Sequence, residues 1–325
     1  MDASRWLIAT CAVLAWTTGL ADALPSSALR DEPIQPIPLP SPGDPARVAL
    51  GRRLFSDKSL SGNRSVSCAS CHDLHAAGSD PRGRGVGSGG QVTRFKVPTV
   101  FNAALNFRQF WNGRAASLEA QVEDVVASPA EMGGKWTDIV DRVAADPAYR
   151  RAFGIAYADG ITRHNLVDAI ASFERTLLTQ NAPFDRYLRG DASAISAAER
   201  RGYEAFKQFG CVSCHQGVNV GGNMFQKFGV MRDYFGEPGG AKSTDLGRFE
   251  VTGRAEDRRV YKVPSLRTVS LGGPYLHDGS ARTLGAAVDI MFKYQLGRTA
   301  SAADKASIIL FLGTLMGERP ASLTP

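Results

Sequence analysis

Two copies of one five-residue pattern put a pair of thiols beside a histidine, at Cys68-Ala69-Ser70-Cys71-His72 and at Cys211-Val212-Ser213-Cys214-His215. The pattern C-x-x-C-H is typical of covalent haem attachment, in which both thiols bond to vinyl groups and the histidine ligates the iron. One copy could also belong to a zinc or redox site, but two copies that use every cysteine after Cys11 favour haem. We therefore predict two covalently bound haem c groups, with His72 and His215 as proximal iron ligands.

The chemistry of each haem depends on its sixth iron ligand, because a catalytic haem needs an open face and an electron-transfer haem is six-coordinate. Three other histidines are present. His75 follows the first motif too closely to reach the opposite face, His164 opens an expected helix, and His277 lies in a turn-rich segment. Methionine is the other common ligand, although each one is more often core packing: the candidates are Met132, Met224, Met231, Met291 and Met316.

The composition is that of an ordinary globular protein. The chain has 325 residues, with 43% hydrophobic and 22% charged residues, and a formal net charge of +6. This length favours about two domains. A basic surface could steer an acidic redox partner or simply keep the protein soluble. No run of Lys and Arg is interleaved with aromatic residues, so we predict no nucleic-acid partner.

The N-terminus resembles a secretory signal. Arg5 precedes a mostly apolar stretch, residues 6–20, and Ala21-Asp22-Ala23 fits a small-x-small cleavage site. We predict a signal peptide over residues 1–23, with a retained membrane anchor as the alternative. Cleavage would remove Cys11 and leave no membrane span. Since covalent haem attachment occurs on the exported side of bacterial membranes, we predict a periplasmic protein.

The remaining sequence is typical of a mainly α protein. Apolar residues at helical spacing and capping signals predict helices over 45–55, 115–127, 163–179, 196–209, 284–296 and 302–316. Alternating strand patterns are scarce, and two glycine-rich stretches, 78–90 and 217–240, are expected to wrap the haems. We predict two cytochrome c-like domains, 24–182 and 183–325, separated near Pro183. The tail after Gly297 is expected to pack back on the first domain.

Four further segments, in family order, resemble the bacterial dihaem cytochrome c peroxidases and the related MauG enzymes. They are Pro98–Asn102, Gln109–Ala115, Ala182–Asp185 and Pro274–Gly279, and the resemblance extends from about Gly51 to Pro320. It implies that His72 serves a low-potential haem at which peroxide reacts. It also implies that His215 serves a high-potential haem that stores an electron.

The resemblance assigns roles to four more residues. Met291 would be the axial ligand of the second haem, and Trp111 would relay electrons between the two haems. Gln121 and Glu131 would lie over the open face of the first haem. These last two roles are chemically reasonable, because a carboxylate can move a proton between the two peroxide oxygens while an amide orients the peroxide.

The chain departs from the family pattern in two places. The loop 85–94 has no histidine, whereas many members use one there to block the peroxide-reacting iron. We therefore predict an N-terminal haem that is open at rest. Lys96 stands where the family has a calcium-binding asparagine, which leaves calcium uncertain, since an ammonium group cannot ligate calcium. We hypothesise that Lys96 supplies the positive charge itself.

The leading hypothesis is a periplasmic peroxidase that reduces H2O2 to water with electrons from a small cytochrome c or a cupredoxin. A second hypothesis is a MauG-like oxidase that matures a partner protein. Those enzymes use a tyrosine in place of Met291, and Tyr294 lies close to that position. A third is a non-catalytic dihaem electron carrier. The resemblance also allows a homodimer.

Overall fold

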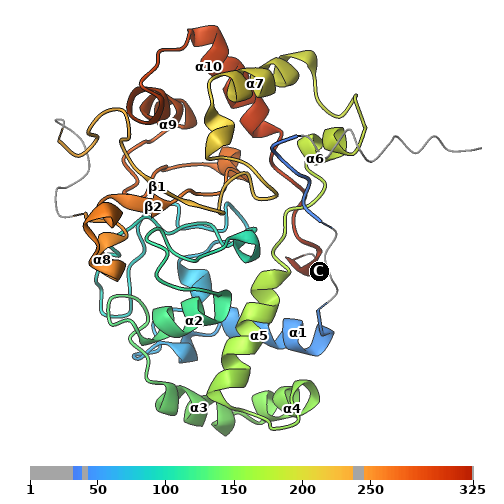
Figure 1. Ribbon diagram of the computed structural model, residues 1–325. Coiled ribbons are helices and arrows are strands. Elements are labelled where there is room, and N and C mark those ends of the chain that lie inside the picture. Colours follow the sequence, from blue (N-terminus) through green and yellow to red (C-terminus); the bar gives the residue numbers. More distant parts are fainter. Residues whose placement is uncertain (1–31, 39–42, 237–244, 324–325) are drawn as a thin grey trace, which may run out of the picture.

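The computed structural model describes residues 32–38, 43–236 and 245–323 (Figure 1). The predicted signal peptide and Cys11 lie outside these ranges. Within them, no helix combines the length and apolar character that a bilayer crossing requires.

The prediction of a mainly α fold is confirmed. The helices are α1 (Pro45–Phe55), α2 (Leu118–Ala127), α3 (Trp136–Ala145), α4 (Pro147–Ala156), α5 (Arg163–Arg175), α6 (Pro183–Leu188), α7 (Ala197–Gln208), α8 (Phe249–Thr252), α9 (Leu284–Ile290) and α10 (Ala302–Gly313). Short helical turns join them, and two short strands, β1 (Phe225–Lys227) and β2 (Val260–Lys262), pair antiparallel. Side-chain caps begin several helices, as with Thr162 before α5 and the capping box at Ser196 before α7.

Two helix pairs cross in the same way, and each pair organises one half of the molecule. In the first pair a Cβ atom on Gly51 of α1 would lie 1.9 Å from the carbonyl oxygen of Ala169 in α5. In the second pair a Cβ atom on Gly202 of α7 would lie 1.9 Å from the carbonyl oxygen of Ser307 in α10. Only glycine allows such close backbone approach. We call the half built on α1–α5 the N-terminal unit, and the half built on α6, α7, α9 and α10 the C-terminal unit (Figure 1).

The two units also share a repeated segment. Residues 95–126 align without gaps on 261–292, and both copies contain Lys-Val-Pro near their start. The backbone repeats as well, because Phe110 and its counterpart Leu276 both have positive φ angles, 66° and 69°. The copies exchange hydrogen bonds: the Lys96 N–H donates to the His277 carbonyl at 2.8 Å, and the Lys262 N–H donates to the Trp111 carbonyl at 2.7 Å. This exchange joins the units face to face.

The helix predictions hold in position but differ at the ends. The observed α2 begins three residues later than expected, and α5 ends at Arg175. After α9 the chain continues as a π-helical turn, η7 (Met291–Leu296), rather than as regular α-helix. The sequence analysis missed α3, α4, α6 and the short α8. Proline occupies the first turn of α4 and α6, so Pro183 starts a helix where we expected an interruption.

The C-terminal tail lies against the N-terminal unit. The Arg319 guanidinium donates to the Leu74 carbonyl oxygen at 2.7 Å, and the Thr176 hydroxyl donates to Ser322 at 2.8 Å. Leu323 packs on the cluster that contains Phe55 and Phe173. The domain boundaries 24–182 and 183–325 remain predictions.

We expect Gly51→Ala to lower the thermal unfolding midpoint of the protein, because the new methyl group would overlap the α5 backbone. Overpacking of this kind costs about 1–3 kcal/mol. The matched control is Gly154→Ala in α4, where an added Cβ meets no atom within 4 Å. The control should be neutral or stabilising by about 0.5–1 kcal/mol. Equal midpoints for the two variants would contradict the close crossing.

Candidate functional site

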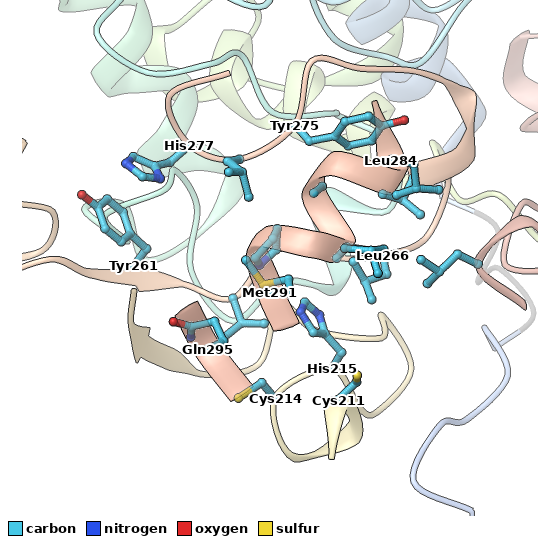
Figure 2. A pocket seen from close by; sticks show the side chains of 18 of the residues that line it. Cys211, Cys214, His215, Tyr261, Leu266, Tyr275, His277, Leu284, Met291 and Gln295 are labelled. Atoms are coloured by element: carbon cyan, nitrogen blue, oxygen red, sulfur yellow. The ribbon is translucent and has the colours of Figure 1, made fainter. Parts of the chain in front are cut away.

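The C-terminal unit encloses a cavity of about 390 Å³ lined by Cys211, Cys214, His215 and Met291, which we call the C-terminal cavity (Figure 2). Nδ1 of His215 lies 3.3 Å from the carbonyl oxygen of Val220. Since a carbonyl only accepts, Nδ1 carries the proton and Nε2 keeps its lone pair. Burial lowers the pKa of His215 to about 4, so the imidazole is neutral, as an iron ligand must be.

Met291 reaches the same cavity from a different element. Thr283 caps the start of α9, and Met291 follows that helix as the first residue of η7 (Figure 2). Single π-helical turns occur frequently at functional sites. Its counterpart in the repeated segment is Val125, which lines the cavity of the other unit. The two cavities therefore differ at a position that could hold a sixth ligand.

The N-terminal unit encloses a cavity of about 540 Å³ lined by Cys68, Cys71 and His72, which we call the N-terminal cavity. Nδ1 of His72 lies 3.0 Å from the Gly78 carbonyl oxygen, which again leaves Nε2 for a metal. Burial raises the pKa of the Cys68 thiol to about 12. Within the described residues, no group of three or more His, Cys, Asp and Glu could hold a metal ion.

Each cavity therefore fits a haem better than it fits a zinc ion. Both have predominantly apolar walls, a free imidazole nitrogen and two thiols that are not in a disulfide. A covalently bound haem would use Cys68, Cys71 and His72 in one unit, and Cys211, Cys214 and His215 in the other.

Two residues that the resemblance assigns to peroxide chemistry lie on the wall of the N-terminal cavity. Gln121 comes from α2, which begins at the Ser117 cap, and Glu131 follows that helix. The Glu131 side chain is 24% exposed, and Arg114 Nη2 lies 3.4 Å from its Oε2. Burial raises the pKa of Glu131, while the Arg114 charge acts in the opposite direction.

The glycine-rich loop packs directly on the Glu131 segment. The Ser88 N–H donates to the Glu131 carbonyl at 2.7 Å, and the Ser88 hydroxyl donates to the Met132 carbonyl at 2.9 Å. A Cβ atom on Gly87 would lie 2.2 Å from the Ala130 carbonyl oxygen, which explains the glycine there. Among the described residues that line the N-terminal cavity, His72 is the only histidine. Met132 also lines it but is packed in the helical core, 3% exposed.

Trp111 lies between the two cavities and lines both of them. Its indole N–H donates to the Lys96 carbonyl oxygen at 2.8 Å. Its ring lies 6.3 Å from the ring of His277, its counterpart in the repeat. Nε2 of His277 lies 3.0 Å from Asp245 Oδ2, and its ring stacks on Tyr261 at 4.3 Å. His75 and His164 are both exposed, and neither lines a cavity.

The sequence analysis missed several buried charged residues on the cavity walls, among them Lys262 and Glu174. Lys262 is 7% exposed and lines the C-terminal cavity, and it makes no ion pair within the described residues. Burial lowers its pKa to about 8. Glu174 is 5% exposed and lines the N-terminal cavity. The repeated Lys-Val-Pro is a signal in the sequence that could have identified Lys262, because Lys262 aligns with Lys96. Lys96 lines both cavities.

Two similar helical units, each with a buried cavity and one C-x-x-C-H segment, define a dihaem c-type cytochrome. The sequence profile described as "Di-haem cytochrome c peroxidase" matches residues 45–193. The chain is 39% identical over 312 residues to a cytochrome c551 peroxidase of Nitrosomonas europaea, covering 96% of this chain and 92% of that protein. It is 34% identical over 339 residues to a methylamine utilization protein MauG of Methylorubrum extorquens, covering 98% and 93%.

Cytochrome c peroxidase Ccp of Escherichia coli is 43% identical over 290 residues, covering 89% of this chain, although the chain spans only 62% of that relative's length. Among solved structures, a MauG-like protein associated with microbial copper homeostasis superposes with a TM-score of 0.76 and 29% identity, covering 94% of this chain and 96% of that one. The chain therefore belongs to the dihaem cytochrome c peroxidase family of oxidoreductases, and the family implies haem c as cofactor. The prediction of two cytochrome c-like domains is confirmed.

We expect the wild-type protein to bind no stoichiometric calcium, because the Lys96 ammonium cannot ligate it and is mostly buried, with its pKa lowered to about 8. Lys96→Asn supplies an amide oxygen and should allow one calcium ion to bind. The check is metal analysis after calcium removal and reloading. Lys262→Asn, at the equivalent position of the repeat, is the matched control and should bind none. Stoichiometric calcium in the wild type would refute the hypothesis.

Proposed function

We propose that this protein is a periplasmic peroxidase that reduces H2O2 to water with electrons from a small cytochrome c or a cupredoxin. The main support for this proposal is a difference between two equivalent positions of the repeat: Met291 lines the C-terminal cavity, whereas Val125 lines the N-terminal cavity. A thioether can complete the coordination of one haem, whereas a valine leaves the other open to substrate. One site is therefore suited to hold an electron and the other to react.

The residues that would hold the cofactors are the two C-x-x-C-H sets, with Met291 as the sixth ligand of the C-terminal haem. When bound, the haems supply the redox chemistry of peroxide cleavage. Loop 85–94 supports an open N-terminal haem, because it contains no histidine and its backbone is held against the Glu131 segment. The enzyme should then be active without prior reduction to expose the iron.

Glu131 is placed to move a proton during peroxide cleavage. As a carboxylate it can accept a proton from one peroxide oxygen and return it to the other. Arg114 stabilises the charged form, and the bidentate contact of that guanidinium with Asp124, at 2.9–3.1 Å, fixes its position. The amide of Gln121, on the same wall, can orient the peroxide.

Trp111 is placed to carry electrons between the units. Its indole lines both cavities, and its N–H bond to the Lys96 carbonyl fixes the ring. With haems bound in both cavities, Trp111 would provide the route for single electrons that a protein donor delivers to the C-terminal unit.

A MauG-like maturase is the second candidate, since a MauG protein is 34% identical to this chain. Its axial tyrosine would have to come from Tyr294. That residue is 8% exposed and does not line the C-terminal cavity. Its hydroxyl accepts a hydrogen bond from Lys293 at 2.8 Å, and its ring packs on Tyr234. Met291, which does line the cavity, favours the peroxidase. A pure electron carrier would need a second sixth ligand, which Val125 does not provide.

We expect Glu131→Gln to reduce peroxide-dependent oxidation of reduced cytochrome c by about 10²- to 10⁴-fold, because an amide cannot accept the peroxide proton. Steady-state kinetics of the holoenzyme measure this loss. The matched control is Glu123→Gln, on the exposed side of α2 beside Arg163, and it should retain wild-type turnover. Wild-type turnover in Glu131→Gln would overturn the assignment. Absence of turnover in the wild type, combined with a stable high-valent species, would favour the maturase.

We expect the fully oxidised holoenzyme to contain one low-spin and one high-spin or water-ligated haem, by electron paramagnetic resonance and optical spectra. Met291→Val copies the valine of the N-terminal unit and should convert the low-spin signal to high-spin. The reciprocal control, Val125→Met, leaves the C-terminal signal unchanged. Two low-spin haems in the oxidised wild type would contradict an open N-terminal haem.

A further inference from the structure

Glu174 is a buried carboxyl group on the wall of the N-terminal cavity that the proposed peroxide chemistry does not use. It lies near the end of α5 and is 5% exposed. Its Oε2 atom is buried and has no hydrogen-bond partner within the described residues. Burying a carboxyl without a partner is costly, so a fold selected only for stability would not place one here.

The repeated architecture shows that the fold does not need this carboxyl group. Gly51 packs against Phe173 of α5, and Gly202 packs against Phe311 of α10 in the same way. Phe173 and Phe311 therefore occupy equivalent positions in the two units. The residues that follow them, Glu174 and Leu312, are equivalent as well. Leu312 is 3% exposed and lines the C-terminal cavity. One unit thus has a hydrocarbon side chain where the other has an acid.

Burial and two charged side chains, those of Glu119 and Arg175, determine the pKa of Glu174. Burial is the main cause that raises its pKa, to about 8, and the carboxylate of Glu119 on α2 raises it further. Arg175, the next residue on α5, acts in the opposite direction and is paired with Glu119. Glu174 and Cys68 line the same cavity, and the charge of Glu174 raises the pKa of the Cys68 thiol.

We propose that Glu174 is the proton-binding group coupled to oxidation and reduction of the haem in the N-terminal cavity. The proposal rests on the haem placement in the proposed function but not on peroxide turnover. In the coupled step the donor protein supplies one electron to the haem, and the Glu174 carboxylate takes one proton from solvent to become a neutral acid. Oxidation returns the electron and releases that proton, so charge and atoms balance.

The coupling follows from electrostatics at short range in a low-dielectric cavity. A ferric haem carries one more positive charge than a ferrous haem, and this charge favours the carboxylate over the acid. The proton affinity of Glu174 is therefore lower in the oxidised protein than in the reduced protein. Between the two pKa values, reduction takes up a proton, so the reduction potential falls as pH rises, with a limit of one proton per electron.

The test is a spectroelectrochemical titration of both haems in the holoprotein at a series of pH values from about 5 to 9, the range around the raised pKa. In the wild type, the N-terminal haem potential should fall with pH. Glu174→Leu, which copies the leucine of the C-terminal unit, and Glu174→Gln should both reduce this dependence to the part that Lys96 of the same cavity contributes, and both should leave a higher potential at alkaline pH. The C-terminal haem is the internal control: at each pH its potential should be the same in the wild type and in both variants, because the lysines that line its cavity, Lys96 and Lys262, are unchanged.

Glu119→Gln is the matched second variant. Because the Glu119 charge raises the pKa of Glu174, its removal should move the pH-dependent range to lower pH without abolishing it. The proposal is overturned if the N-terminal haem of the wild type has no pH dependence, or if a folded Glu174→Gln or Glu174→Leu protein keeps it undiminished. Both outcomes are independent of whether the protein reduces peroxide, which the Glu131→Gln assay decides separately.

Discussion

The exchange of two backbone hydrogen bonds between the units is the constraint on which the arrangement of both cavities depends. The Lys96 N–H donates to the His277 carbonyl, and the Lys262 N–H donates to the Trp111 carbonyl. Because these atoms are equivalent in the repeated segment, the bonds fix the units face to face. Trp111 is held at the junction and lines both cavities. Electron transfer between the haems would depend on this contact between the units, because it positions the Trp111 ring between the two cavities.

The two units share one frame and differ in a few wall positions that determine their chemistry. Both units have a helix crossing at a glycine, and both have a histidine whose Nδ1 atom lies within hydrogen-bond distance of a backbone carbonyl oxygen. The differences, N-terminal residue first, are Val125 for Met291, Gln121 for Ala287 and Glu174 for Leu312. In two of the pairs the N-terminal cavity has a polar side chain where the C-terminal cavity has an apolar one. In the third pair the C-terminal cavity has a thioether that could ligate iron, where the N-terminal cavity has valine. The polar side chains of Gln121 and Glu131 line one cavity, and the thioether of Met291 lines the other.

Much of this organisation could be predicted from the sequence, because the motifs and helix caps are local signals. The haem motifs were found, and so were α1, α2, α5, α7, α9 and α10, for which caps and apolar spacing are local signals. The amphipathic helix α3 was missed although its apolar residues also recur at helical spacing. The positions of Glu131 and Gln121 came only from the family resemblance, since nothing local marks an acid as part of a cavity wall. Glu174 did leave a signal: it falls on the apolar face of α5 with Ile170 and Phe173, where a charge is unexpected.

The charged side chains on the cavity walls and the predicted iron ligands should both influence the reduction potentials of the two haems. The N-terminal cavity is lined by Glu131 and Glu174 as well as by Lys96, and each carboxyl group there would stabilise the oxidised state when it is ionised. In the C-terminal cavity, Lys262 contributes an ammonium group without a carboxylate partner in the described parts of the chain, and Met291 contributes a thioether. Both stabilise the reduced state. If haems are bound as proposed, Met291 and Lys262 would raise the potential of the C-terminal haem relative to that of the N-terminal haem.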